Sequence, residues 1–161
     1  MATNVKYADV AVGTKIPEQD FPVQRVDLVK YAGASGDFNI IHWNERVARS
    51  VGLPDVIAHG MFTMAEAIRV VTDWAGDPGA VVEYGVRFTR PVAVPDPDGA
   101  VLHVEGKVRA LRDDGLVEVD LTATVDGQTV LAKARAVSYP PKADRLIPRS
   151  AGDSRSAPQA R

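Results

Sequence analysis

The hydrophobic and polar positions of this chain follow one period up to about residue 76 and another after residue 79. In the first part, apolar residues recur at three- and four-residue steps, which is typical of helices. The clearest helical pattern covers 59–74, where one apolar stripe is formed by Met61, Met64, Ala65, Ile68, Val71 and Ala75. Because further apolar residues flank this stripe, we expect a helix that is buried on most sides.

Shorter elements are predicted on the N-terminal side of this helix. Residues 14–23 favour a strand, and 26–34 favour a short helix with Asp27 well placed against the helix dipole. A second short helix is predicted over 44–51, with Asn44 as its N-cap.

The second part of the chain alternates between apolar and polar residues, as strands do. Strands are predicted over 81–90, 101–111, 116–125 and 129–139. Asp-Gly pairs separate the last three strands, and strands joined by tight turns run antiparallel. The pattern alone therefore predicts an α+β fold in which an antiparallel sheet packs on one main helix.

Composition narrows the class of protein. The 161 residues suffice for one domain, and 45% hydrophobic and 25% charged residues are ordinary for a globular protein. The absence of cysteine excludes disulfides, thiolate nucleophiles and cysteine-based zinc sites. A net charge of −2 favours neither nucleic acid nor a membrane surface as a partner. With no secretory signal and no membrane-spanning stretch recognisable, a cytoplasmic location is expected.

The last part of the chain differs from the rest. Residues 1–140 are expected to form the domain, whereas 141–161 are rich in Pro, Ser, Ala and Gly and carry a net positive charge. Such a segment buries little apolar surface, so we expect a disordered basic tail.

The richest candidate chemistry lies in Gly36-Asp37-Phe38-Asn39-Ile40-Ile41-His42. After a glycine-containing bend, Asp37, Asn39 and His42 bring a carboxylate, a carboxamide and an imidazole close together. These groups can converge on one water or one hydroxyl, as reversible addition of water to a double bond requires. The same residues also fit plain turn chemistry, in which the side chains bond their own backbone. No second cluster completes a metal site and no phosphate-binding loop is present, so neither metal nor cofactor is expected.

A second candidate site begins the long helix at His59-Gly60-Met61. The first N–H groups of a helix lack internal partners, and together with the helix dipole they attract negative charge. Glycine at position 60 lets a ligand approach the backbone closely. We therefore assign the Gly60 N–H to an oxyanion site, with a tightly packed helix start as the alternative. His59 is interpreted as structural, and His103 as a solvated strand residue.

The motif Gly36-Asp37-x-Asn39-x-x-His42, together with 57–61 and 84–92, resembles the signature of the MaoC-like dehydratases and (R)-specific enoyl hydratases. Within that family the chain most resembles the catalytic B-type subunit of actinobacterial (3R)-hydroxyacyl-acyl carrier protein dehydratases. This finer resemblance is carried by four further runs, at 27–33, 41–43, 74–80 and 86–89. The resemblance implies a hot-dog fold, in which the sheet wraps around the long helix. It also implies that Asp37 and His42 form the catalytic pair and that Asn39 positions them.

The implied reaction is the reversible dehydration of a (3R)-hydroxyacyl thioester, carried on coenzyme A or acyl carrier protein, to the trans-2-enoyl thioester. A homodimer, or a heterodimer with a related hot-dog subunit, is implied as well. Ile40 stands where the family usually has proline, so a changed loop is expected rather than a lost activity. Three alternatives remain, namely a coenzyme A-linked enoyl hydratase, a hot-dog thioesterase and a non-catalytic partner subunit. The sequence leaves open which of Asp37 and His42 is the acid.

Overall fold

The computed structural model describes residues 10–141 of the chain. The predicted tail begins at residue 141, and the rest of it, 142–161, lies outside the described residues. The elements in chain order are β1 (Lys15–Val23), α1 (Arg25–Ser35), the 3-10 helix η2 (Ile40–His42), α2 (Glu45–Ser50), α3 (Gly60–Ala75), β2 (Val81–Phe88), β3 (Ala100–Leu111), β4 (Val117–Val125) and β5 (Gln128–Ser138). Every predicted helix and strand is confirmed, and η2 is an addition.

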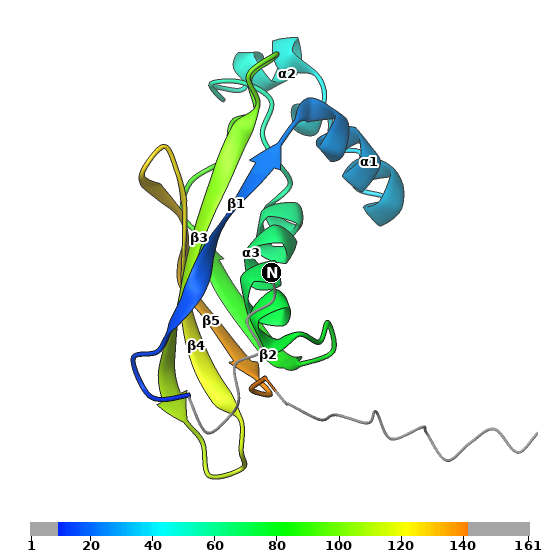
Figure 1. Ribbon diagram of the computed structural model, residues 1–161. Coiled ribbons are helices and arrows are strands. Elements are labelled where there is room, and N and C mark those ends of the chain that lie inside the picture. The colour runs from blue at the N-terminus through cyan, green and yellow to red at the C-terminus, as the bar shows by residue number, and fades with distance from the viewer. Residues whose placement is uncertain (1–9, 142–161) are drawn as a thin grey trace, which may run out of the picture.

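The five strands form one antiparallel sheet in the order β1-β3-β4-β5-β2. The sheet curves around one side of α3, while α1 and α2 lie beyond one end of that helix (Figure 1). β1 and β2 are the two edge strands. The predicted α+β arrangement, an antiparallel sheet on one main helix, is therefore confirmed.

The core lies between α3 and the concave face of the sheet. β4 contributes Val117, Val119, Leu121 and Ala123, the apolar side of its predicted alternation. On α3 the buried apolar residues are Ala67, Val70, Val71 and Trp74. The prediction of which face of α3 is buried is therefore wrong. Of the six residues in the predicted stripe only Val71 is fully buried, and Met61 is 58% exposed. The sheet covers only one side of α3, so apolar residues on the other side remain open to solvent in the single chain.

α1 is held to this core by Leu28 and Ala32, which are its two buried residues. A capping box at its start includes the bond from the Gln24 N–H to Asp27 Oδ2 (3.0 Å). The helix ends at Gly36, whose φ of 77° lies in the left-handed region that glycine adopts without strain. The chain leaves α1 in this way directly before Asp37.

A half-buried charge network fixes the segments around this exit. The Arg25 guanidinium binds Glu45 at 2.7 Å and Asp55 at 2.6 Å, and its Nε donates to the Val94 carbonyl at 3.0 Å. Arg49 also contacts Asp55, at 3.3 Å. These bonds join α1, α2 and the segment that leads into α3. None of the helices in residues 10–141 combines the length and the hydrophobicity that a membrane-spanning helix needs.

Candidate active site

The loop after α1 is shaped by its own polar side chains. Asp37 Oδ1 accepts a hydrogen bond from the Asn39 N–H at 3.1 Å, and Asn39 Oδ1 accepts one from the Ile41 N–H at 3.3 Å. The turn chemistry considered for this sequence is therefore present. Asn39 is the N-cap of η2, and η2 ends on His42. The side chain of Asn39 thus helps to fold the turn that carries the imidazole.

His42 is buried, with 8% of its surface exposed, and its ring has a defined orientation. Its Nδ1 lies 2.7 Å from the carbonyl oxygen of Ile57. A carbonyl oxygen only accepts, so Nδ1 carries the hydrogen in this bond. The neutral ring consequently has its lone pair on Nε2, which is the nitrogen that a proton can reach.

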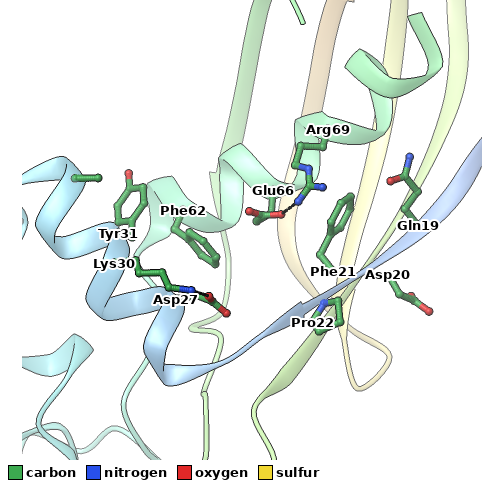
Figure 2. A pocket seen from close by; sticks show the side chains of 11 residues that line it. Gln19, Asp20, Phe21, Pro22, Asp27, Lys30, Tyr31, Phe62, Glu66 and Arg69 are labelled. Carbon is green, nitrogen blue, oxygen red and sulfur yellow. Dashed lines mark hydrogen bonds and ion pairs between the residues drawn. The ribbon is translucent and has the colours of Figure 1, made fainter. Parts of the chain in front are cut away.

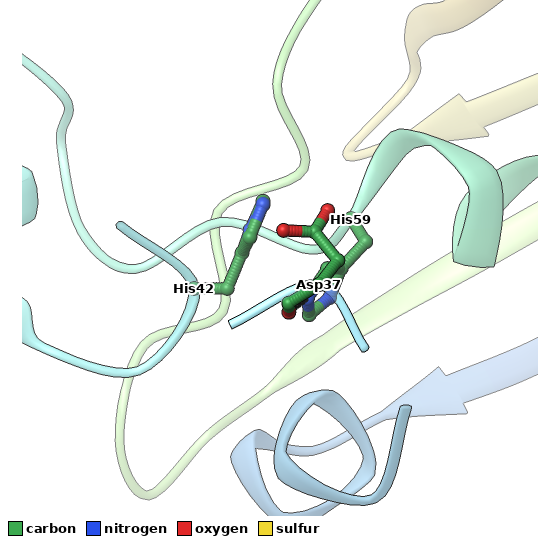
Figure 3. Close-up of side chains that lie close together, drawn as sticks. All are labelled: Asp37, His42 and His59. Carbon is green, nitrogen blue, oxygen red and sulfur yellow. Dashed lines mark hydrogen bonds between the residues drawn. The ribbon is translucent and has the colours of Figure 1, made fainter. Parts of the chain in front are cut away.

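Asp37 lies beside this imidazole, with its carboxylate turned toward the far end of the His42 ring (Figure 3). A carboxylate oxygen of Asp37 and a ring nitrogen of His42 lie within 4.8 Å of each other. One water with hydrogen bonds of about 2.8 Å to each side can bridge such a gap. The structure therefore brings together the two residues that the motif singled out, although Asp37 itself is exposed.

His42 also lines a cavity of about 330 Å³ at the start of α3. Gly60 lies in its lining with the polar residues Thr63, Thr89 and Arg90, and the apolar lining consists of Ile57, Ala58, Phe88, Pro91, Val92, Val130 and Leu131. Asp37 and Asn39 do not line it. The first residue of α3 and His42 therefore line one mostly apolar cavity.

Gly60 has little space for a side chain. An added Cβ would lie 3.2 Å and 3.3 Å from two ring atoms of Phe88, which is closer than ordinary van der Waals contact. Phe88 is itself 50% exposed at this cavity. The glycine therefore allows the aromatic ring, as well as any ligand, to approach the helix start.

His59 is the residue whose place the sequence did not predict. Its ring stacks on His42, with the centroids 3.7 Å apart and the planes at 24°. Its Nε2 donates to the carbonyl oxygen of Asp37 at 3.0 Å. Burial lowers the pKa of His59, and the bond to the Asp37 carbonyl opposes this effect in part. The companion motif at 59–61 marked the residue, but its contact with His42 depends on the fold.

Asp37, His42 and His59 each offer one ligand atom within 4.8 Å of the others, which is a spacing that a metal ion can use. Both imidazoles already give one N–H to a backbone carbonyl, so only one nitrogen per ring remains for coordination. A second group of this kind, Glu18, His103 and Glu105, lies on β1 and β3. His103 was expected to be merely solvated, but its Nδ1 lies 2.7 Å from Asp20.

A larger cavity of about 540 Å³ lies between α1, α3 and β1 (Figure 2). Phe21, Tyr31 and Phe62 supply aromatic surface there. The surrounding charges pair with one another, Lys30 with Asp27 at 3.2 Å and Arg69 with Glu66 at 2.6 Å. Because its charges are already matched and no histidine lines it, this cavity offers no pair comparable to Asp37 and His42.

Comparison with known proteins identifies the family. The sequence model described as MaoC like domain matches residues 8–127, so the chain belongs to the MaoC-like family. The 3-hydroxyacyl-thioester dehydratase X of Mycobacterium tuberculosis is 42% identical over 102 residues, which cover 61% of this chain and 35% of that protein. The (R)-specific enoyl-CoA hydratase of Rhodospirillum rubrum is 30% identical over 119 residues, which cover 73% of this chain and 81% of the hydratase. The chain thus spans about a third of the first relative and most of the second.

Solved structures confirm the predicted hot-dog fold. A MaoC-like dehydratase superposes with a TM-score of 0.80 at 40% identity, over 83% of this chain and 42% of that chain. The ChsH1-ChsH2 complex from Mycobacterium tuberculosis superposes with a TM-score of 0.70 at 25% identity, over 80% of this chain and 98% of that chain. The structural neighbours therefore include a complex of two different hot-dog subunits.

Proposed function

We propose that this protein catalyses the reversible loss of water from a (3R)-hydroxyacyl thioester to give the trans-2-enoyl thioester. One observation carries the proposal, namely that a carboxylate and an imidazole lie within 4.8 Å of each other. His42 also lines a mostly apolar cavity at a helix start. The names of the relatives, a hydroxyacyl-thioester dehydratase and an enoyl-CoA hydratase, support the same reaction.

In dehydration, a proton leaves the carbon next to the thioester carbonyl, and the hydroxyl on the next carbon departs as water. Asp37 and His42 divide these two proton transfers, and the lone pair of His42 Nε2 is available to accept a proton. Positioned acid–base groups of this kind contribute about 10²–10⁴-fold in rate. In hydration the same pair orients one water, which delivers hydroxide to C3 and a proton to C2.

The negative charge that develops on the thioester oxygen needs a donor, and the proposed donor is the Gly60 N–H. It is the first N–H of α3, where the helix dipole adds to its attraction for an anion. Each such donor is worth about 3–4 kcal/mol in the transition state. His42 and Gly60 line the same cavity, so one thioester can meet both. The acyl chain would lie against the apolar residues of this cavity.

The working assembly is proposed to be a dimer, either of two copies or with a related hot-dog subunit. β2 is an edge strand and therefore has backbone groups free to pair with another strand. Its exposed apolar residues include Val82 and Phe88. Since Phe88 borders the cavity, a subunit placed on this edge would help to enclose the acyl chain.

The test is an assay with enoyl thioesters of graded length, on coenzyme A and on acyl carrier protein. Loss of the conjugated enoyl absorbance is followed with and without a co-expressed related subunit. We expect hydration to the (3R)-hydroxyacyl product. Release of free thiol would instead identify a thioesterase, and binding without turnover under all conditions would identify a non-catalytic subunit.

A further inference from the structure

His59 is linked to three of the four residues assigned to the proposed catalytic site, namely Asp37, His42 and Gly60. It donates to the Asp37 carbonyl at 3.0 Å, it stacks on His42 at 3.7 Å, and it is the residue peptide-bonded to Gly60. Only 1% of its surface is exposed. Among the described residues, only His59 contacts both Asp37 and His42 and also precedes Gly60. A role in filling space alone does not account for this position.

Two contacts on the His42 ring, its hydrogen bond to Ile57 and its stacking on His59, restrain different motions of that ring. The bond from His42 Nδ1 to the Ile57 carbonyl holds the imidazole within its own plane. The stacked ring of His59 blocks tilting out of that plane, and Tyr31 supports the His59 ring with the centroids 4.9 Å apart. The bond from His59 to Asp37 then fixes the backbone that bears the carboxylate. Together these contacts set the separation between carboxylate and imidazole.

The protonation state of His59 suits this role. Its Nε2 must carry a hydrogen to donate to a carbonyl, and its Nδ1 is buried without a hydrogen-bond partner among the described residues. Burial also lowers the pKa of His59. A neutral ring is required here, because an imidazolium stacked 3.7 Å from His42 would repel the positive charge that His42 acquires when it takes up a proton.

We infer that His59 is a positioning residue for the proposed reaction, because it ties Asp37 to the start of α3 and braces the His42 ring. The inference rests on the proposed function and names a further residue on which that function depends. Displacement of catalytic groups by about 1 Å can cost about 10²-fold in rate. His59 therefore acts on the rate of the chemical step and not on substrate binding.

Two variants separate the two contacts. His59→Phe keeps an aromatic ring for the stack but removes the donor to Asp37, and His59→Gln keeps a donor but removes the ring. The matched control is Val70→Ala, a buried substitution further along α3 that lowers stability without touching the site. For each protein we measure kcat and KM for enoyl thioester hydration, the binding of a saturated acyl thioester, and the thermal midpoint.

The expected result is a fall in kcat of about 10–100-fold for His59→Phe, with KM and binding within about threefold of wild type. His59→Gln should recover part of this loss, and Val70→Ala should lose stability but keep its kcat. A folded His59→Phe variant with kcat within threefold of wild type overturns the inference. So does an equal loss of kcat in Val70→Ala.

A measurement on the unaltered protein covers the case in which the variants do not fold. Nitrogen-15 NMR of labelled histidines should show His59 neutral, with its hydrogen on Nε2, at pH 7. A charged His59, or one with its hydrogen on Nδ1, overturns the inference. An inactive wild-type protein with the expected His59 tautomer would instead refute the proposed function, so the two failures are distinguishable.

Discussion

His59 at the start of α3 and His103 on β3 show the same side chain in opposite surroundings. His59 is buried against another imidazole, its hydrogen bond goes to a backbone carbonyl, and burial lowers its pKa. His103 lies 2.7 Å from Asp20 and 3.5 Å from Glu105, and the bond to Asp20 raises its pKa. Within the described part of the chain, only the first setting lies beside the cavity lined by His42 and Gly60. Carboxylates beside an imidazole favour its protonated form, as at His103, whereas burial against a second imidazole favours the neutral form, as at His59.

The largest expected effect is on turnover, which should depend on the residues around His59 and not on those around His103. Asp37→Asn and His42→Ala should each reduce kcat for enoyl thioester hydration by about 10²–10⁴-fold, because each removes one of the two proton-transfer groups. His103→Gln should leave kcat within about twofold of wild type. Near wild-type turnover in either of the first two variants would contradict the assignment of the pair.

A smaller effect is expected at the helix start. Gly60→Ala places a methyl group 3.2 Å from the Phe88 ring and beside the proposed oxyanion site, so kcat/KM should fall about tenfold. The double variant Gly60→Ala with Phe88→Ala relieves the crowding of the ring. Recovery of stability without recovery of kcat/KM is the expected result. Full recovery of both would mean that the glycine serves only the packing of Phe88.

The two histidines should also contribute to stability with opposite dependence on pH. A lowered pKa means that the unfolded chain binds a proton more readily, so the contribution of His59 is present above pH 6.5 and is lost as the pH falls below that value. A raised pKa reverses this, so the contribution of His103 is present below pH 6.5 and is lost as the pH rises through its folded value.

Denaturant unfolding from pH 5 to pH 9 measures both contributions. The difference in unfolding free energy between wild type and His103→Gln should shrink as the pH rises. The difference between wild type and His59→Phe should shrink as the pH falls. Parallel curves for wild type and both variants would show that neither histidine changes its proton affinity on folding.

The smallest effect is expected at Ile40, in the loop that carries Asp37 and His42. Ile40 begins η2, where proline is compatible with a helix start, and Asn39 has ψ of 126°, a value that proline accepts in the preceding residue. Ile40→Pro should therefore raise the unfolding free energy by about 0.4–1 kcal/mol and leave kcat unchanged. A clear loss of stability would show that the Ile40 N–H has a role that proline removes.

The sequence predicted the parts of the molecule that depend on local pattern. Period and turn residues located all helices and strands except η2, which is too short to have a period. The proximity of Asp37 and His42 followed from their separation within one loop. The buried face of α3 could not be predicted in the same way, because apolar residues surround much of that helix and only the sheet decides which of them are covered. The contact of His59 with His42 likewise needs the helix start to meet a loop from earlier in the chain.

Each end of the loop from Gly36 to His42 is held by a hydrogen bond to a backbone carbonyl outside the loop. The Gly36 N–H binds the Ala32 carbonyl at 2.9 Å, and the His42 ring binds the Ile57 carbonyl. Main-chain carbonyls are the same whatever side chains an evolving sequence selects. Substitutions of strand residues that line the cavity beside His42, such as Leu131, therefore leave both attachments of this loop in place.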